Sequence, residues 1–283
     1  RNWSAGWLPA SCQGTPLQTN PPSAGQANPS GRSSPVANLE SPADVPADAR
    51  RDQLAFLSAI NRRHQARHPE NAELAARIQN YELAARMQVS VPEAVDFAQE
   101  SEATRRQYGV EDPISGAFGR NCLLARRLLE RGVRFVQLWS GAAFGADQHW
   151  DAHGDVPSNH SKEARKIDLP IAGLLRDLRR RGMLDDTLVV FNTEFGRTPF
   201  SQSAKDKAGP GRDHNPETFT EWLAGAGLKH GVSYGSSDDV GWSAAEGTVS
   251  VYDFHATILH LLGIDHERLT YFHQGRRFRL TDV

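Results

Sequence analysis

Cysteine is scarce in this sequence, and its scarcity excludes two classes of small scaffold. The only two cysteines, Cys12 and Cys122, are far apart, and neither has a second Cys or a His at the spacing of a metal clip. They therefore support neither a zinc knuckle nor a disulfide framework. Whether the two pair with each other stays open.

A surplus of charge and a long apolar run are also lacking. The 32 Lys and Arg residues face 34 Asp and Glu residues, which gives a net charge of −2. This balance argues against a nucleic-acid partner and against an acidic tail. The longest apolar stretches, 188–191 and 258–264, fall far short of the roughly 20 residues that span a bilayer, so no transmembrane segment is expected. A chain of 283 residues is long enough for one large α/β domain or two small ones.

Proline is concentrated at the start of the chain. Eight of the sixteen prolines precede residue 47, among Ser, Gly, Asn and Ala, and a segment of this composition buries too little to order itself alone. Residues 1–47 are therefore expected to wrap over another surface or to stay mobile. Residues 48–110 have apolar residues at near-helical spacing and are predicted to form a helical insertion, with His64 and His68 solvated. Residues 111–283 remain for an α/β core, and the whole chain is expected to form one domain.

Helices and short apolar strands alternate in residues 111–283. An amphipathic helix is expected to stop at Gly132, and the β-branched and aromatic stretch 133–139 is typical of a strand. The next helix is predicted to run from an N-cap at Asp168, with Pro170 in its first turn, to Gly182. The apolar stretch 187–191 is typical of a strand covered on both faces. Strand, helix and strand in this order predict a right-handed βαβ unit and a mostly parallel sheet.

Polar residues follow both predicted strands and form the candidate site. The carboxyl ends of parallel strands open on one edge of a sheet, where α/β proteins bind ligands. Imidazole nitrogens with carboxylate oxygens suit zinc, manganese or iron, whereas carboxylates with water suit calcium or magnesium. The expected metal ligands are Asp151, His153, Glu194, Asp213 and His214, and the expected anion-binding residues are Arg197 and Arg212.

Each of these residues also has a purely structural interpretation. Asp151 and His153 can form a solvated turn, and Glu194 can cap a helix or pair with a base. His214 precedes Asn215, a good N-cap followed by a proline, so a helix is expected to begin there with exposed NH groups beside His214. Convergence of the whole set is what favours a binding site.

Five segments carry a resemblance to a known family. They are 148–153 (QHWDAH), 186–199 (DTLVVFNTEFGRTP), 211–216 (GRDHNP), 252–263 (YDFHATILHLLG) and 274–280 (QGRRFRL). Together they resemble the bacterial family named domain of unknown function 1501, which is similar to the alkaline phosphatase and sulfatase superfamily. The resemblance implies a three-layer α/β fold with a mostly parallel sheet, an exported protein, and a bound divalent metal (Zn, Ca, Mg or Mn). It is strong over about residues 114–283.

The resemblance also implies roles for individual residues. Asp151, His153 and His214 correspond to one metal site, and Glu194 corresponds to an acidic ligand of another. This sequence departs from the superfamily pattern in two places: the spacing between Asp151 and His153 is shorter than usual, and Phe195 stands where the superfamily usually has a ligand. In that superfamily the first strand ends in a metal-binding Asp and precedes the nucleophile. We therefore expect that part of the fold to precede this sequence, and the 283 residues alone to be inactive.

The function implied is that of a metal-dependent hydrolase of phosphate or sulfate esters, acting on a small molecule or a saccharide. The alternative is a catalytically degenerate member that binds a metal or a saccharide, or serves as a scaffold, without turnover. Phe195 is the residue that favours the alternative.

Overall fold

The computed structural model describes residues 46–69, 93–140, 150–201 and 209–282, together with positions 14, 17, 74, 78 and 82. They belong to two compact units, residues 1–101 and 102–283. The predicted Pro-rich segment 1–47 lies outside the described residues except at positions 14, 17, 46 and 47, and Cys12 and His149 lie outside them as well. Within the described residues, no helix combines the length and the apolar character needed to cross a membrane.

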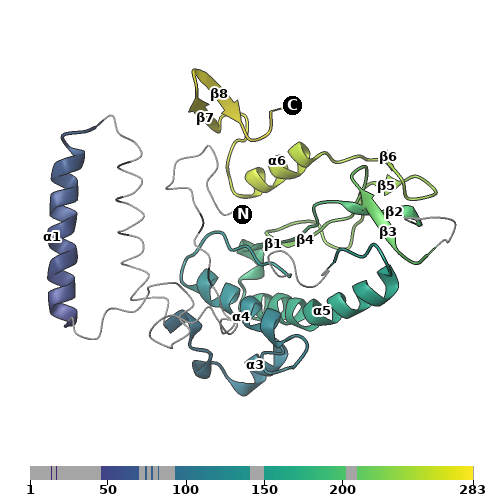
Figure 1. Ribbon diagram of the computed structural model, residues 1–283, viewed down its shortest axis with the longest axis horizontal. Helices are drawn as coiled ribbons and strands as arrows, with labels where there is room; N and C mark the ends of the chain where they lie inside the picture. Colours follow the sequence, from purple (N-terminus) through teal and green to yellow (C-terminus); the bar gives the residue numbers. More distant parts are fainter. Residues whose placement is uncertain are drawn as a thin grey trace. The chain divides into compact units, whose positions relative to one another are not determined.

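Helices form the described part of the first unit. The helix α1 (Ala47–Gln65; Figure 1) begins within one residue of the predicted helical segment. The short helix η2 (Phe97–Gln99) follows later in the chain. His64 and His68 lie close together at the end of α1, with ring centroids 4.7 Å apart. These elements agree with the helical pattern of residues 48–110, and the role of this segment as an insertion stays a prediction.

The core of the second unit lies between two long helices. After α3 (Glu102–Gln107), the helices α4 (Gly116–Glu130) and α5 (Val156–Arg180) pack against each other (Figure 1). Tyr108, Cys122, Leu123 and Leu178 are fully buried there. Cys122 carries a free thiol, and burial raises its pKa above the usual range. The helix α4 ends where the sequence predicts, since Gly132 lies just beyond it with a φ of 83°.

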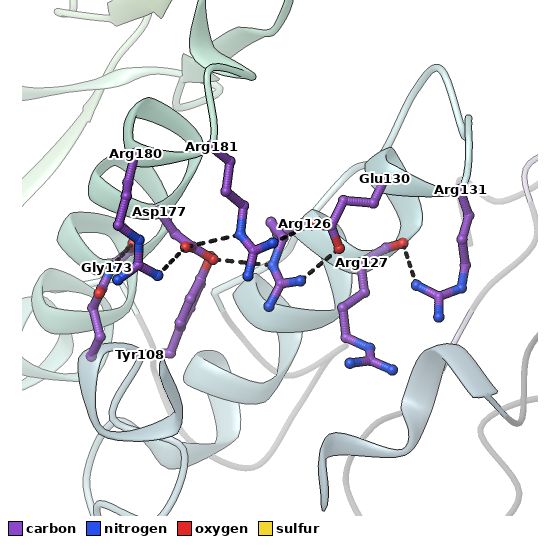
Figure 2. Close-up of polar contacts among 10 residues, drawn as sticks. Tyr108, Arg126, Arg127, Glu130, Arg131, Gly173, Asp177, Arg180 and Arg181 are labelled. Atoms are coloured by element: carbon purple, nitrogen blue, oxygen red, sulfur yellow. Dashed lines mark hydrogen bonds and ion pairs between the residues drawn. The ribbon is translucent and has the colours of Figure 1, made fainter. Parts of the chain in front are cut away.

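A buried carboxylate joins α4 to α5. Asp177 of α5 forms an ion pair with Nε of Arg126 over 3.1 Å and accepts a hydrogen bond from the Tyr108 hydroxyl over 3.0 Å (Figure 2). Arg180 and Arg181 also donate to it, over 2.6 and 3.0 Å. Burial raises the pKa of the Asp177 carboxyl, but the hydrogen bonds from Arg180 and Tyr108 outweigh burial and hold this pKa below its usual range. Asp177 is therefore charged at neutral pH.

The start of α5 differs from the prediction. The N-cap is Asp155, whose carboxylate accepts a hydrogen bond from the Ser158 NH over 3.1 Å, and Pro157 lies in the first turn. Asp168, the predicted N-cap, and Pro170 both lie inside the helix. The same pair of signals, an Asp followed two residues later by Pro, occurs at both places, and composition alone does not show which pair starts the helix.

The strands form short antiparallel pairs, so the prediction of a mostly parallel sheet is wrong for the described residues. β1 (Leu188–Phe191) forms at the predicted place, but it pairs antiparallel with β4 (Trp222–Gly225), and its four residues are only half-buried. Residues 133–139 belong to no strand, and Phe135 and Trp139 are exposed. Apolar, β-branched sequence favours extended backbone but does not specify its partner, and a half-buried antiparallel pair needs no helix on its second face.

The remaining elements follow the same pattern of local pairing. β2 (Gly196–Ser201) pairs with β3 (Arg212–Asn215), and this hairpin holds part of the candidate site. The short helix η3 (Leu184–Asp186) precedes β1, and the chain ends in β5 (Ser236–Ser237), β6 (Ala244–Glu246), α6 (Val251–Leu261), β7 (Thr270–His273) and β8 (Arg276–Arg279). These elements combine helix and strand, without a parallel strand pair in the described residues.

Candidate metal centre

Two segments of the second unit carry the candidate site. The first is the loop that leads into α5, and the second is the β2–β3 hairpin. Backbone hydrogen bonds join them: the Arg212 NH donates to the Ala152 carbonyl over 3.3 Å, and the Val156 NH donates to the Pro210 carbonyl over 3.1 Å. These bonds fix the loop beside the start of β3.

Gly211 allows the two segments to approach this closely. A Cβ atom at this position would lie 1.8 Å from the carbonyl oxygen of His153, inside any possible contact distance. Only glycine lacks this atom, so only glycine lets the loop backbone pass here without a shift. The position of His153 therefore depends on Gly211.

Three predicted ligands meet where the loop and the hairpin join. One ligand atom from each of Asp151, His153 and His214 lies within 4.8 Å of the others. Oδ1 of Asp151 is 2.7 Å from Nε2 of His153 and 3.0 Å from Nε2 of His214. The three side chains are 54%, 32% and 42% exposed, so the cluster faces solvent and is accessible to a ligand. Two imidazole nitrogens and one carboxylate oxygen can hold a divalent metal from three directions and leave other positions open.

Arg197 and Asp213 surround this cluster. Nη2 of Arg197 donates to Oδ1 of Asp151 over 3.1 Å and to the Trp150 carbonyl over 2.9 Å. Oδ1 of Asp213 is 3.8 Å from Nδ1 of His153, on the side of the ring away from Asp151. A carboxylate behind a metal-binding imidazole commonly orients the ring, so Asp213 fits this supporting position better than that of a direct ligand.

Glu194, the fifth predicted ligand, is not part of this cluster. It follows β1 by three residues and is exposed. Its neighbour Phe195 lies closer, because the Phe195 ring stacks on the His214 ring with centroids 4.0 Å apart. The structure thus brings the two halves of one predicted metal site together and leaves the acidic residue predicted for the other site outside.

The charge state of the cluster follows from its hydrogen bonds. The hydrogen bond from His214 holds the pKa of the Asp151 carboxyl below its usual range; burial opposes this shift, and the hydrogen bond from Arg197 adds to it. Asp151 is therefore ionised at neutral pH, the form in which a carboxylate binds a cation.

The helix start predicted at Asn215 is not found, and Arg212 has backbone partners that the sequence did not predict. Asn215 does not begin a helix, because it is the last residue of β3. Its side chain accepts a hydrogen bond from the Glu217 NH over 3.0 Å and donates one to the Trp242 carbonyl over 2.9 Å. Residues 214–216 therefore do not form the helix N-terminus expected beside His214. Arg212 donates through Nη1 to the carbonyls of Gly209 and Gly211, over 3.1 and 2.8 Å, and anion binding by Arg212 stays a prediction.

The sequence did not indicate the role of His160. Its Nε2 lies 3.1 Å from the carbonyl oxygen of Trp150, and the two rings meet edge to face with centroids 5.4 Å apart. His160 lies in the second turn of α5, so this contact ties the loop to the helix that follows. The predicted start of α5 placed His160 outside the helix, which concealed the contact.

The family described as "Protein of unknown function (DUF1501)" matches residues 1–283. No curated protein matches the sequence, and no solved structure matches it either.

Proposed function

We propose that this chain, which belongs to the DUF1501 family of proteins of unknown function, binds one divalent metal ion through Asp151, His153 and His214. We further propose that the protein uses this ion to hydrolyse phosphate or sulfate esters. The observation that carries this proposal is the meeting of the three side chains from segments far apart in the sequence. Two of them precede α5, and the third follows it on the β2–β3 hairpin.

The ligand set and its spacing fit a zinc ion. Ligands about 2.0–2.1 Å from a tetrahedral zinc lie about 3.3 Å from one another. The two histidine nitrogens are 2.7 and 3.0 Å from Oδ1 of Asp151, so a metal would need them to move apart by a few tenths of an ångström. Two imidazoles favour zinc over calcium or magnesium, which prefer oxygen ligands alone.

Hydrolysis would draw on the metal and on residues of this chain. A zinc ion with an open position lowers the pKa of a bound water to about 7 and takes up charge on an ester oxygen. Asp151, His153 and His214 would hold the ion, and their exposed side chains would leave it accessible to an ester. Arg212 lies two residues before His214, on the same face of β3, where its guanidinium can attract the remaining anionic oxygens.

A metal- or saccharide-binding protein without turnover is the second candidate, and one observation favours it. Phe195 stacks on His214 and follows Glu194, so an apolar ring stands where the resembling superfamily has a ligand for another metal. With a single metal, the protein would have only half of the centre that the superfamily uses. Metal binding fits both candidates, and turnover separates them.

Metal content tests the first part of the proposal. After removal of metals with a chelator and addition of Zn²⁺, we expect one equivalent of zinc by elemental analysis. His214→Ala should lower the affinity at least about tenfold, because a ligand is lost and even a supporting residue is worth that much. His230→Ala is the matched control, since His230 is an exposed histidine of the same unit outside the cluster. No zinc in the wild-type chain, or unchanged binding in His214→Ala, would contradict the proposal.

Turnover tests the second part. We expect the protein, as its gene encodes it, to release p-nitrophenol from p-nitrophenyl phosphate or p-nitrophenyl sulfate when loaded with zinc, and His214→Ala to abolish this release. Zinc bound without release of either product would favour the binding protein over the hydrolase.

A further inference from the structure

Arg197 bonds to both segments that carry the predicted ligands. Arg197 lies on β2, and its guanidinium donates through Nη2 to the Trp150 carbonyl and to Oδ1 of Asp151, over 2.9 and 3.1 Å. It also donates through Nη1 to the Arg212 carbonyl over 3.2 Å. Its side chain is only 17% exposed. One planar group thus spans the loop before α5 and the strand β3.

Arg197 also lies beside the other side of the cluster. Its guanidinium carbon is 5.8 Å from the centroid of the Phe195 ring, and that ring stacks on His214. Arg197 and His214 are directly opposite each other in the β2–β3 ladder. Arg197 therefore contacts Asp151 directly and is linked to His214 through Phe195 and through the strand pairing.

We propose that Arg197 is a positioning residue that holds Asp151 and the loop around it in the geometry of the metal site. This inference rests on the proposed function and assigns Arg197 a different role from the anion binding expected from the sequence. Three of the five N–H groups of this guanidinium donate to protein acceptors, which ties it to both segments of the site. A planar guanidinium reaches three acceptors in fixed directions, which the single ammonium of lysine does not reproduce.

Charge and positioning lead to opposite expectations for metal binding. A cation beside the site repels a metal ion, so if Arg197 acted only through its charge, its removal would tighten binding and its replacement by lysine would change nothing. If Arg197 positions Asp151, both replacements must weaken binding, because the carboxylate loses the bonds that orient it.

The test measures the affinity for Zn²⁺ alone in three variants of the full chain. Arg197→Lys keeps the positive charge and loses the planar guanidinium. Arg197→Met keeps much of the side-chain volume and loses the charge. Arg176→Lys is the control, because Arg176 is an exposed arginine on α5 outside the cluster. Competition with a chromophoric chelator gives the dissociation constant, and circular dichroism confirms that each variant is folded at the assay temperature.

We expect both Arg197 variants to raise the dissociation constant for zinc about 10- to 100-fold and the control to leave it unchanged. The visible spectrum of bound Co²⁺ should differ from that of the wild type in Arg197→Lys, since a misplaced carboxylate changes the coordination, and a purely structural loss of stability would not do this in a folded protein. Unchanged zinc affinity in Arg197→Lys, or tighter binding in Arg197→Met, would overturn the inference. Absence of zinc binding in the wild type would instead overturn the proposed function.

Discussion

Replacing Asp177 with alanine should be among the most destabilising single changes in the second unit. Asp177 is fully buried and faces Arg126, whose side chain is only 2% exposed. Removing the carboxylate leaves this guanidinium without the ion pair that joins α4 to α5. It also removes the acceptor of the Tyr108 hydroxyl, which is itself buried.

The expected cost follows from these partners. Breaking a buried ion pair by removing one member costs about 3–5 kcal/mol, and a buried hydroxyl left without its acceptor costs about 1–3 kcal/mol. The two costs overlap, and Arg126 keeps its bond to Glu130, at 2.6 Å. The bonds from Arg180 and Arg181 add little, because both side chains reach solvent. We therefore expect a loss of about 3–5 kcal/mol in the free energy of unfolding, near the lower end.

Urea denaturation followed by circular dichroism measures this loss, and a double-mutant cycle assigns it. Asp185→Ala, at an exposed position just after α5, should change the free energy of unfolding by less than about 0.5 kcal/mol. The double variant Arg126→Met with Asp177→Ala should lose clearly less free energy of unfolding than the sum of the losses in the two single variants. The reason is that the double variant has no buried guanidinium left without its carboxylate. A loss below about 1 kcal/mol in Asp177→Ala, or additive costs in the cycle, would refute the reasoning.

Two further predictions follow from the same structure. Gly211→Ala should weaken zinc binding about tenfold or more, because its Cβ would lie 1.8 Å from the carbonyl oxygen of His153. Gly154→Ala is the control and should bind zinc as the wild type does, because its Cβ would meet nothing within 4 Å. Equal zinc affinities of the two variants by chelator competition would show that the close approach is not needed. The pKa of Asp177 is lowered on folding, so its contribution to stability is present above the unfolded value of about 3.9 and is lost as the pH falls through the folded value. The difference in unfolding free energy between the wild type and Asp177→Asn should therefore shrink as the pH is lowered from 6 to 3, and a constant difference would contradict this assignment.

The sequence predicted individual elements better than their partners. The end of α4 just before Gly132 and the strand predicted at 187–191 are set by local signals, a glycine with positive φ and a short apolar run. Both elements form, the strand over 188–191. Which strand pairs with which depends on contacts between distant residues, and no local signal showed that β1 would pair with 222–225. The parallel sheet was predicted from the order of elements and from the family resemblance, and it is wrong for the described residues.

The candidate site shows the same division between local and distant information. Asp151 and His153 are two residues apart and could be paired from the sequence. His214 was joined to them through the expected edge of a parallel sheet, but the structure brings it there by another route, the β2–β3 hairpin and the backbone bonds of residues 152 and 212. Glu194 was placed by the same argument, and no such hairpin contact brings it to the cluster. The hydrogen bonds of Arg197 reach two carbonyl oxygens and one carboxylate oxygen that only the folded chain brings together.

The two halves of the cluster lie far apart along the chain, so metal binding to the cluster depends on folding. Asp151 and His214 are 63 residues apart, and all of α5 and β1 lies between them. In the unfolded chain the two halves are held together by no structure, and bringing them together would cost the entropy of closing this long loop. A metal ion that needs both halves would therefore bind the native state and not the unfolded one. Free ligand at 100 times its dissociation constant would then add about 2.7 kcal/mol to the stability of the whole unit, and the melting temperature would rise with its concentration. A thermal shift assay thus becomes a screen for the natural occupant of the cluster, without any assumption about the reaction.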